Sequence, residues 1–167
     1  MRVWRIATDT PTYTADDLRG LGAKTTGGRW NRAGSPMVYC AESISLAAME
    51  TLVHLGAGGL PLNRYLVSVE IPEAIWQRRQ RLSMQSAPVG WDALPTGKVS
   101  LDFGDAWLSS LASVVLVVPS IVVPEESNIL INPQHPDASG LSATKLRKWR
   151  YDERLLPPQE THTEPVQ

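Results

Sequence analysis

The sequence predicts an α+β fold, a single compact domain of short strands and few helices. Short apolar runs alternate along the chain with segments rich in glycine and proline, a pattern typical of short strands joined by turns. The longest helical pattern covers only residues 44–55. The chain of 167 residues has the length of one domain.

The N-terminal part contains two predicted strands with a predicted helix between them. Residues 3–6, VWRI, form the first apolar run, and residues 36–41, PMVYCA, form the second. Residues 14–21 are predicted as a helix because Thr14 suits its N-cap and Asp16 and Asp17 fall in its first turn.

The predicted helix over residues 44–55 has Ser43 as its cap and stops at Gly56. Apolar side chains cover nearly its whole circumference, so most of the helix is expected to be buried. Glu50 is its only carboxylate. A carboxylate on such a helix must be paired, face a cleft or have a shifted pKa, whereas in the alternative interpretation Glu50 lies on a narrow exposed strip with Thr51 and His54.

The second half of the chain is predicted to complete the sheet. Residues 64–71 alternate as a strand with one exposed face, and residues 114–118, VVLVV, are apolar on both faces and therefore lie inside a sheet. Residues 77–96 are predicted to be irregular, and residues 105–112 a short helix. The remaining segments are strands over 121–123, 128–131 and 148–152, a proline-broken loop over 132–137, and a polar tail beyond residue 156.

Composition excludes several kinds of function. Hydrophobic residues make up 43% of the chain, which indicates a globular protein, and a net charge of -1 gives a nucleic-acid partner no support without excluding one. The one cysteine, Cys40, cannot form an internal disulfide, and the three histidines have no metal-ligand spacing, so no metal site is expected. The N-terminus lacks the apolar core of a secretory signal, and no apolar run approaches the roughly 20 residues of a membrane span, so a cytoplasmic protein is expected.

Residues 25–34, TTGGRWNRAG, form a glycine-rich loop of unusual composition. Adjacent glycines let the backbone approach a ligand closely, and Arg29 offers a planar fork of donors that suits phosphate. In the alternative interpretation the loop is a tight turn with a surface Arg29 and a core Trp30. Arg29, Tyr39 and Glu50 together suit a nucleotide with a glycosidic bond, because an arginine can hold phosphate, an aromatic ring can pack on a planar base, and an acid can stabilise the cation-like transition state of ribosyl cleavage.

The order of these motifs resembles a known family. Residues 22–54, GAKTTGGRWNRAGSPMVYCAESISLAAMETLVH, are similar to the glycine loop, tyrosine and ExLVH helix of the RES domain. The Arg, Glu and Ser for which that family is named match Arg29, Glu50 and, within residues 117–137, Ser120. The closing WRYDERL, residues 149–155, also resembles the family's usual ending, so the similarity covers most of the chain.

This resemblance implies an NAD-consuming toxin of a two-gene toxin–antitoxin system, with a fold similar to that of ADP-ribosyltransferases. It implies catalytic roles for Arg29, Glu50 and Ser120, and an NAD pocket made by these residues and Tyr39. By the same resemblance the glycine loop holds the nicotinamide half and the pyrophosphate of NAD, which is a substrate and not a resident cofactor. The implied partner is a separately encoded Xre-like helix-turn-helix antitoxin, through which alone the chain would meet DNA. The RES domain would span residues 1–156, followed by a polar tail over 157–167.

One departure bears on the reaction. Many arginine-directed ADP-ribosyltransferases use two acids in an E-x-E arrangement, whereas here Ala48 and Met49 precede Glu50. The missing acid favours depletion of NAD by hydrolysis or phosphorolysis of its nicotinamide–ribose bond; modification of a protein target and a non-enzymatic nucleotide-binding module are the alternatives. The choice between water and phosphate, and the formation of homo-oligomers, stay open. Ser120 also fits a structural serine in a buried turn, and His54 either pairs with Glu50 or is structural.

Overall fold

A seven-stranded mixed sheet runs through the part of the chain that the computed structural model describes, residues 1–54 and 63–155. The strand order is β4-β5-β6-β2-β1-β3-β7, and every neighbouring pair is antiparallel except β4 and β5. The predicted α+β fold is confirmed. The strands are β1 (Arg2–Ala7), β2 (Val38–Ala41), β3 (Tyr65–Glu70), β4 (Gln80–Arg81), β5 (Val115–Pro119), β6 (Ser127–Ile131) and β7 (Ser142–Lys148), and the helices are α1 (Leu21–Thr26), α2 (Ile44–Leu52), α3 (Glu73–Gln77) and α4 (Lys98–Ser110), with 3₁₀ turns η1 (Pro136–Gly140) and η2 (Glu153–Leu155).

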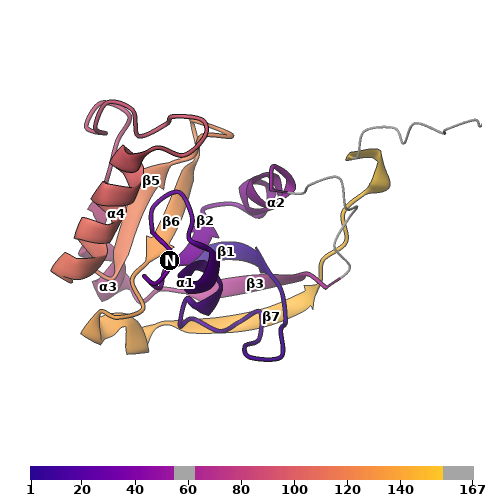
Figure 1. The fold of residues 1–167 in the computed structure, drawn as a ribbon. Helices are drawn as coiled ribbons and strands as arrows, with labels where there is room; N and C mark the ends of the chain where they lie inside the picture. Colours follow the sequence, from indigo (N-terminus) through magenta and orange to yellow (C-terminus); the bar gives the residue numbers. More distant parts are fainter. Residues whose placement is uncertain (55–62, 156–167) are drawn as a thin grey trace, which may run out of the picture.

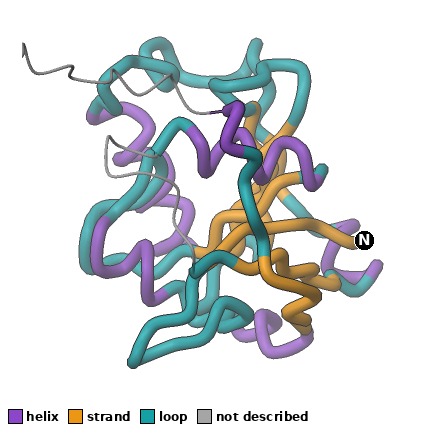
Figure 2. The backbone as a smooth tube through the Cα atoms, turned by 90° about the vertical axis from the view of Figure 1, so that its right-hand side faces the viewer, coloured by secondary structure: helices purple, strands orange, loops and turns teal. Residues whose placement is uncertain are grey.

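Two layers cover the sheet, and they divide the core between them. Side chains such as Ile6 and Ala41 point toward α2, while their neighbours in sequence point to the opposite face, since strand residues alternate. The opposite face packs Val67 and Val69 against Ile75 of α3. Figure 1 shows α2 above the sheet near β1 and β2, with α4 beside β5. Figure 2, turned by 90°, shows the strands running close together with helical segments on either side.

Local sequence determines several elements directly. All five residues of β5 are buried, as their apolar run predicted, because the strand lies inside the sheet between β4 and β6. The predicted cap of α2 is also confirmed, since the Ser43 hydroxyl accepts a hydrogen bond from the Leu46 N–H at 3.0 Å. Strand β3 differs from its prediction in one respect: four consecutive residues, Leu66–Val69, are buried, so both of its faces are covered.

The helix predicted over residues 14–21 is absent, and α1 forms later. The Asp9 carboxylate, from the preceding loop, accepts a hydrogen bond from the Ala15 N–H at 2.7 Å and also makes an ion pair with Lys145 of β7. The Asp17 carboxylate binds the side chain and backbone of Arg19 instead of capping a helix. Tertiary contacts therefore replace the helical hydrogen bonds that the acidic residues suggested.

Helix α4 begins at Lys98, seven residues before the predicted start at Asp105. The earlier turns contain Gly104, and glycine is unfavourable in the interior of a helix. A Cβ at Gly104 would lie 1.8 Å from the Trp30 carbonyl oxygen, so the glycine is required by the close approach of the 25–34 loop.

Two predicted strands are wrong. Residues 121–123 form a turn, because the Ser120 hydroxyl accepts the N–H groups of Val122 and Val123 at 3.0 Å each. The last strand is residues 142–148 instead of 148–152, because its partner β3 pairs Tyr65 with Lys148 and continues no further in that direction.

Helix α2 ends at Leu52, and the predicted stop at Gly56 lies outside the described residues. The expectation that most of this helix is buried is also wrong: the buried residues of α2 are Leu46 and Ala47, while Met49 is 42% exposed and Val53, at its C-cap, is 56% exposed. The predicted tail over residues 157–167 also lies outside the described part. Within the described part, no helix has the length and apolar character needed to cross a membrane.

Candidate active site

Glu50 lies on α2, which the burial of Leu46 and Ala47 fixes against the sheet. Its side chain is half-buried, and one carboxylate oxygen, Oε1, accepts two hydrogen bonds. The Ser120 hydroxyl donates one at 2.7 Å, and the Asn128 side-chain amide donates the other at 2.5 Å. The acid is therefore held in one orientation by residues from two other parts of the chain, as expected for an acid that is paired and faces a cleft.

Ser120 follows β5 and is completely buried. Its oxygen accepts the N–H groups of Val122 and Val123, and its single proton is directed to Glu50. Both sequence-based interpretations of Ser120 therefore apply, because it closes a buried turn and also contacts the acid. Since Ser120 has no exposed surface in this structure, it can act on a ligand only through Glu50.

Asn128 was missed by the sequence analysis. It lies in β6 directly across from Ala41 of β2, on the face of the sheet that α2 covers. The available signal was a polar residue at the start of the otherwise apolar run NILI, which by itself does not distinguish a strand end from a site.

Tyr39 holds the glycine loop in place. Its hydroxyl accepts a hydrogen bond from the Trp30 N–H at 3.0 Å and donates one to the Asn31 side-chain oxygen at 2.7 Å. A Cβ at Gly28 would lie 2.6 Å from this hydroxyl, so glycine is needed there. Burial raises the pKa of Tyr39 well above its ordinary value of 10.0, which keeps the hydroxyl protonated.

Asn31 is the structural centre of the loop. It is completely buried, and its amide nitrogen donates to the carbonyl oxygens of Ala23, Arg32 and Ser35 at 2.8–3.1 Å. A buried amide with all its donors engaged favours one conformation of the loop.

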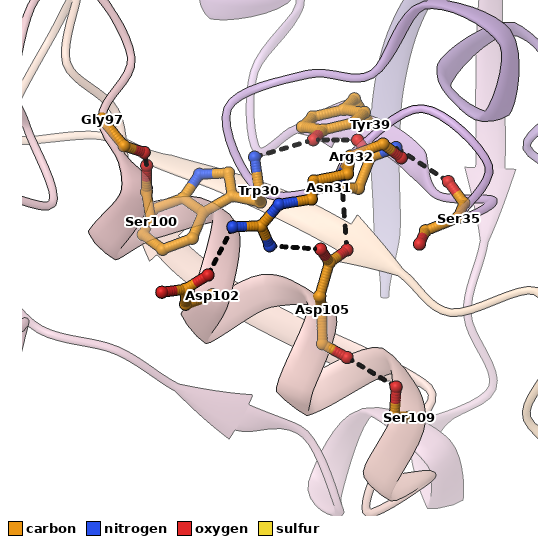
Figure 3. A network of polar contacts seen from close by, with 10 residues as sticks. All are labelled: Trp30, Asn31, Arg32, Ser35, Tyr39, Gly97, Ser100, Asp102, Asp105 and Ser109. Carbon is orange, nitrogen blue, oxygen red and sulfur yellow. Dashed lines mark hydrogen bonds and ion pairs between the residues drawn. The ribbon is translucent and has the colours of Figure 1, made fainter.

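The loop is also attached to α4 (Figure 3). Arg32 makes ion pairs with Asp102 and Asp105, the latter at 2.7 Å. Trp30 is buried, as the alternative interpretation of the loop predicted, and stacks on Trp91 with 5.9 Å between ring centroids. Arg32 is thereby engaged in structure, which leaves Arg29 as the arginine of this loop that faces a cleft.

Arg29 is half-buried and held by backbone carbonyls. Its Nη1 donates to the Trp91 and Ala93 oxygens at 3.1 and 3.0 Å. Within the described residues Nη2 and Nε have no such partner, so a fork edge of the guanidinium stays available to an anion. Desolvation lowers the pKa of Arg29, and the negative charge of nearby Glu50 acts in the opposite direction.

These residues line a cleft with two lobes. The larger lobe has a volume of about 370 Å³ and includes Gly27, Arg29 and Arg64 among its walls. The smaller lobe, about 200 Å³, includes Trp4 and Ala47. Four residues line both lobes and so mark their junction: Tyr39, Glu50, His54 and Asn128.

His54 is exposed at this junction. Among the hydrogen bonds and ion pairs of the described residues, none joins it to Glu50, which has Ser120 and Asn128 as its partners. His135 is elsewhere: it caps η1 by accepting the Asp137 N–H at 3.1 Å and lines a separate cavity.

Comparison with known proteins identifies the chain. The sequence pattern of the RES domain matches residues 2–153. The chain belongs to the RES domain family. Its predicted membership is thereby confirmed.

This RES domain is similar in sequence to named toxins along most of its length. It is 56% identical over 153 residues to a protein of Sphingobium sp. (strain YBL2) named Prs ADP-ribosylating toxin, covering 92% of this chain and 95% of that protein. It is 38% identical over 144 residues to Toxin Res of Yersinia enterocolitica, covering 86% of this chain and 93% of that protein.

A solved structure shares the fold of this RES domain. A chain of the M. tuberculosis MbcT–MbcA toxin–antitoxin complex superposes with a TM-score of 0.60, covering 87% of this chain and 83% of that chain. At 16% sequence identity this likeness establishes the fold alone.

The structure thus brings together all four residues that the sequence singled out in this RES domain. Arg29, Tyr39 and Glu50 line one cleft, and Ser120 lies directly behind Glu50. Their action on NAD stays a prediction.

Proposed function

We propose that this RES domain is the toxin of a toxin–antitoxin pair and an enzyme that cleaves the nicotinamide–ribose bond of NAD. The observation that carries the proposal is Glu50, held by Ser120 and Asn128 in the wall of a cleft that also contains the Arg29 guanidinium. The names of the relatives support the toxin assignment, since both the Sphingobium and the Yersinia proteins are named as toxins.

The chemistry needs an anion beside the ribose. When the bond between C1′ and the nicotinamide nitrogen breaks, both bonding electrons leave with the nitrogen and positive charge develops on the ribose. A fixed carboxylate stabilises this charge more strongly in the transition state than in bound NAD, and such differential stabilisation is what accelerates a reaction. Glu50 fits this role because its orientation is set before substrate arrives.

The pyrophosphate needs a cation. Arg29 fits because its Nη1 is fixed by two carbonyl oxygens while the other nitrogens stay available, so little side-chain entropy remains to be lost on binding. Tyr39 fits a supporting role. Its hydroxyl is engaged with Trp30 and Asn31, so it contributes the ring wall and the shape of the loop instead of a proton.

A protein is the acceptor that we favour for the ADP-ribosyl group. The support is the 56% identity to a protein named as ADP-ribosylating Prs, over 92% of this chain. The second candidate is water or phosphate, giving net loss of NAD. Its support is Ala48 at the position where many arginine-directed ADP-ribosyltransferases have a second acid. The sequence-based preference for loss of NAD therefore stays a prediction beside protein modification.

The second gene of the pair would encode the antitoxin. The shared fold with the toxin of a toxin–antitoxin complex supports a protein partner, and the family resemblance suggests an Xre-like helix-turn-helix protein. We expect a neighbouring open reading frame whose co-expression restores growth. Expression of the chain alone with no effect on growth would contradict the toxin assignment.

One experiment separates the acceptors. Purified protein is incubated with NAD in three reactions: buffer alone, inorganic phosphate, and the Prs protein of the same cell. Free ADP-ribose indicates water, ADP-ribose phosphate indicates phosphate, and a mass increase of Prs by one ADP-ribosyl group indicates transfer to protein. Intact NAD in all three, with the Glu50→Gln variant as baseline, would refute the proposed function.

A further inference from the structure

The segment that follows β7 contacts the helix that carries Glu50. Tyr151 is 8% exposed and belongs to the same buried cluster as Leu46 and Ala47 of α2. Its hydroxyl lies 2.5 Å from the Oγ1 of Thr51, the residue directly after Glu50. Tyr151 is not among the described residues that line the two lobes of the cleft, so it can influence the cleft only through its neighbours.

The direction of this hydrogen bond follows from the single proton of the Thr51 hydroxyl. Thr51 Oγ1 also lies 2.9 Å from the Ala48 carbonyl oxygen and 3.2 Å from the Ala47 carbonyl oxygen, and both of these groups can only accept. The Thr51 proton is therefore directed to the backbone of α2, and the Tyr151 hydroxyl donates to Thr51 Oγ1. The bonds to the two carbonyls are internal to the helix, whereas the bond from Tyr151 connects the helix to another segment.

The two ends of α2 are held in different ways. Leu46 and Ala47, in its first half, are buried against the sheet. Val53, the C-cap, is 56% exposed, so packing constrains this end less. Among the described residues, the side-chain hydrogen bonds that join this end to other segments come from Glu50 and Thr51. The last turn of the helix therefore depends on these bonds for its position.

The same segment is also attached to the start of β3. The Trp149 N–H donates to the Arg64 carbonyl oxygen at 2.8 Å, and Arg64 lines the larger lobe of the cleft. The rings of Trp149 and Tyr151 pack edge to face, with 6.2 Å between their centroids. Residues 149–151 thus connect the helix that carries Glu50 to a second part of the cleft wall.

We infer that Tyr151 is a positioning residue for Glu50: its hydroxyl, acting through Thr51, fixes the last turn of α2. Ser120 and Asn128 orient the carboxylate, and Tyr151 holds the backbone that carries it. The inference rests on the proposed function. A displacement of about 1 Å can lower the rate of an enzyme on the order of 10²-fold, so the position of this turn matters for turnover.

Two substitutions remove the hydrogen bond from its two sides. Tyr151→Phe keeps the ring and removes the donor, and Thr51→Val keeps the shape and removes the acceptor. Each is expected to lower kcat for NAD cleavage about fivefold to tenfold, with KM changed by less than about twofold. The double variant is expected to be no slower than either single variant, because both substitutions remove the same bond. Thr51→Ser keeps the hydroxyl and is expected to retain most of kcat.

Two controls separate positioning from stability, with all rates measured well below Tm. Ser113→Ala removes the hydrogen bonds of a buried hydroxyl with Trp107 and Val115, and Ser113 is not among the described residues that line the cleft. It is expected to lower Tm at least as much as Tyr151→Phe and to leave kcat unchanged. In a Glu50→Gln background, Tyr151→Phe is expected to lower kcat no further, because its effect passes through the carboxylate.

The inference is overturned if Tyr151→Phe has the kcat of the unsubstituted protein, if Ser113→Ala lowers kcat equally, or if Tyr151→Phe lowers kcat by the same factor with and without Glu50→Gln. Thr51 is half-buried, so Thr51→Val gives the same three comparisons if Tyr151→Phe does not fold. In each of these cases turnover by the unsubstituted protein leaves the proposed function standing. An unsubstituted protein that does not cleave NAD overturns the proposed function and this inference together.

Discussion

Replacing Glu50 by Gln is the sharpest test of the chemistry, because it removes a charge and little else. The amide oxygen of glutamine can accept the same two hydrogen bonds, from Ser120 and Asn128, that Oε1 accepts now. Shape and volume are nearly unchanged, so we expect the free energy of unfolding to change by less than about 1 kcal/mol.

The effect on the reaction follows from the lost charge. Two unit charges about 4 Å apart interact by about 4 kcal/mol at an effective dielectric constant of about 20. Glu50 is half-buried, and water in the cleft reduces this to about 3 kcal/mol. A barrier higher by about 3 kcal/mol lowers kcat on the order of 10²-fold, while KM for NAD changes little because the charge acts mainly in the transition state.

The assay measures kcat, KM and Tm on one sample. A catalytic role of Glu50 predicts a lower kcat with an unchanged Tm, whereas a structural role predicts a lower Tm with an unchanged kcat. Ser120→Ala is the contrasting variant. This variant leaves the N–H groups of Val122 and Val123 without their acceptor, and each lost hydrogen bond is expected to lower the free energy of unfolding by about 1–3 kcal/mol. Ser120→Ala should lower kcat less than Glu50→Gln does, because Asn128 still holds the carboxylate of Glu50. A Glu50→Gln protein that is less stable but fully active per folded molecule would refute the reasoning and make the acid structural.

Three further predictions concern other parts of the structure. Arg29→Lys keeps the charge but loses the fork, so NAD binding measured by calorimetry should weaken about tenfold, near 1.4 kcal/mol; equal affinity would exclude a bidentate clamp. Gly104→Ala should lower the free energy of unfolding by about 1–3 kcal/mol, because its Cβ would overlap the Trp30 carbonyl oxygen in the 25–34 loop. Gly97→Ala is the control, since its Cβ would have its nearest neighbour at an ordinary 3.4 Å, and it should change the Tm of thermal unfolding little. The hydrogen bond from Lys145 lowers the pKa of Asp9 below its ordinary 3.8, so the stability that Asp9 contributes is present above that pH and is lost as the pH falls through the folded-state pKa. The Tm of Asp9→Asn should therefore lie below that of the unsubstituted protein at pH 7, and the two Tm values should converge in acid. A Tm difference that stays constant with pH would contradict this role of Asp9.

Sequence reasoning succeeded where local pattern and burial agree. The apolar run of β5 occupies the middle of the sheet, and Ser43 caps α2 as its residue type favours. It failed where a distant partner decides. Asp9, which is ion-paired with Lys145 of β7, accepts the Ala15 N–H, and Asp17 then binds Arg19 in a loop instead of lying in the first turn of a helix.

In the candidate site, too, residues with an unusual local pattern could be recognised from the sequence, whereas their partners from distant parts of the chain were harder to find. The glycine loop and Glu50 were recognisable because an arginine among glycines and an acid on an apolar helix are chemically unusual. The partners of the acid were harder to identify, since Ser120 and Asn128 are 70 and 78 residues away in sequence. The local signal of Asn128, a polar residue at the start of an apolar run, does not distinguish a strand end from a site, and the pairing of β2 with β6 brings it to the face where it binds Glu50.

The direction of the hydrogen bonds around Glu50 has a consequence for the leaving group. Ser120 uses its lone pairs for two backbone N–H groups and gives its proton to Glu50, and the Asn128 amide also donates, so every described neighbour of Oε1 is a donor. Such surroundings suit an acid that receives hydrogen bonds and has no proton to deliver. Glycosidases that cleave a bond to oxygen need a second, protonated carboxyl to release an alcohol. In the proposed reaction, nicotinamide departs from a quaternary ring nitrogen as a neutral molecule, so a single anionic acid is sufficient and no general acid is required.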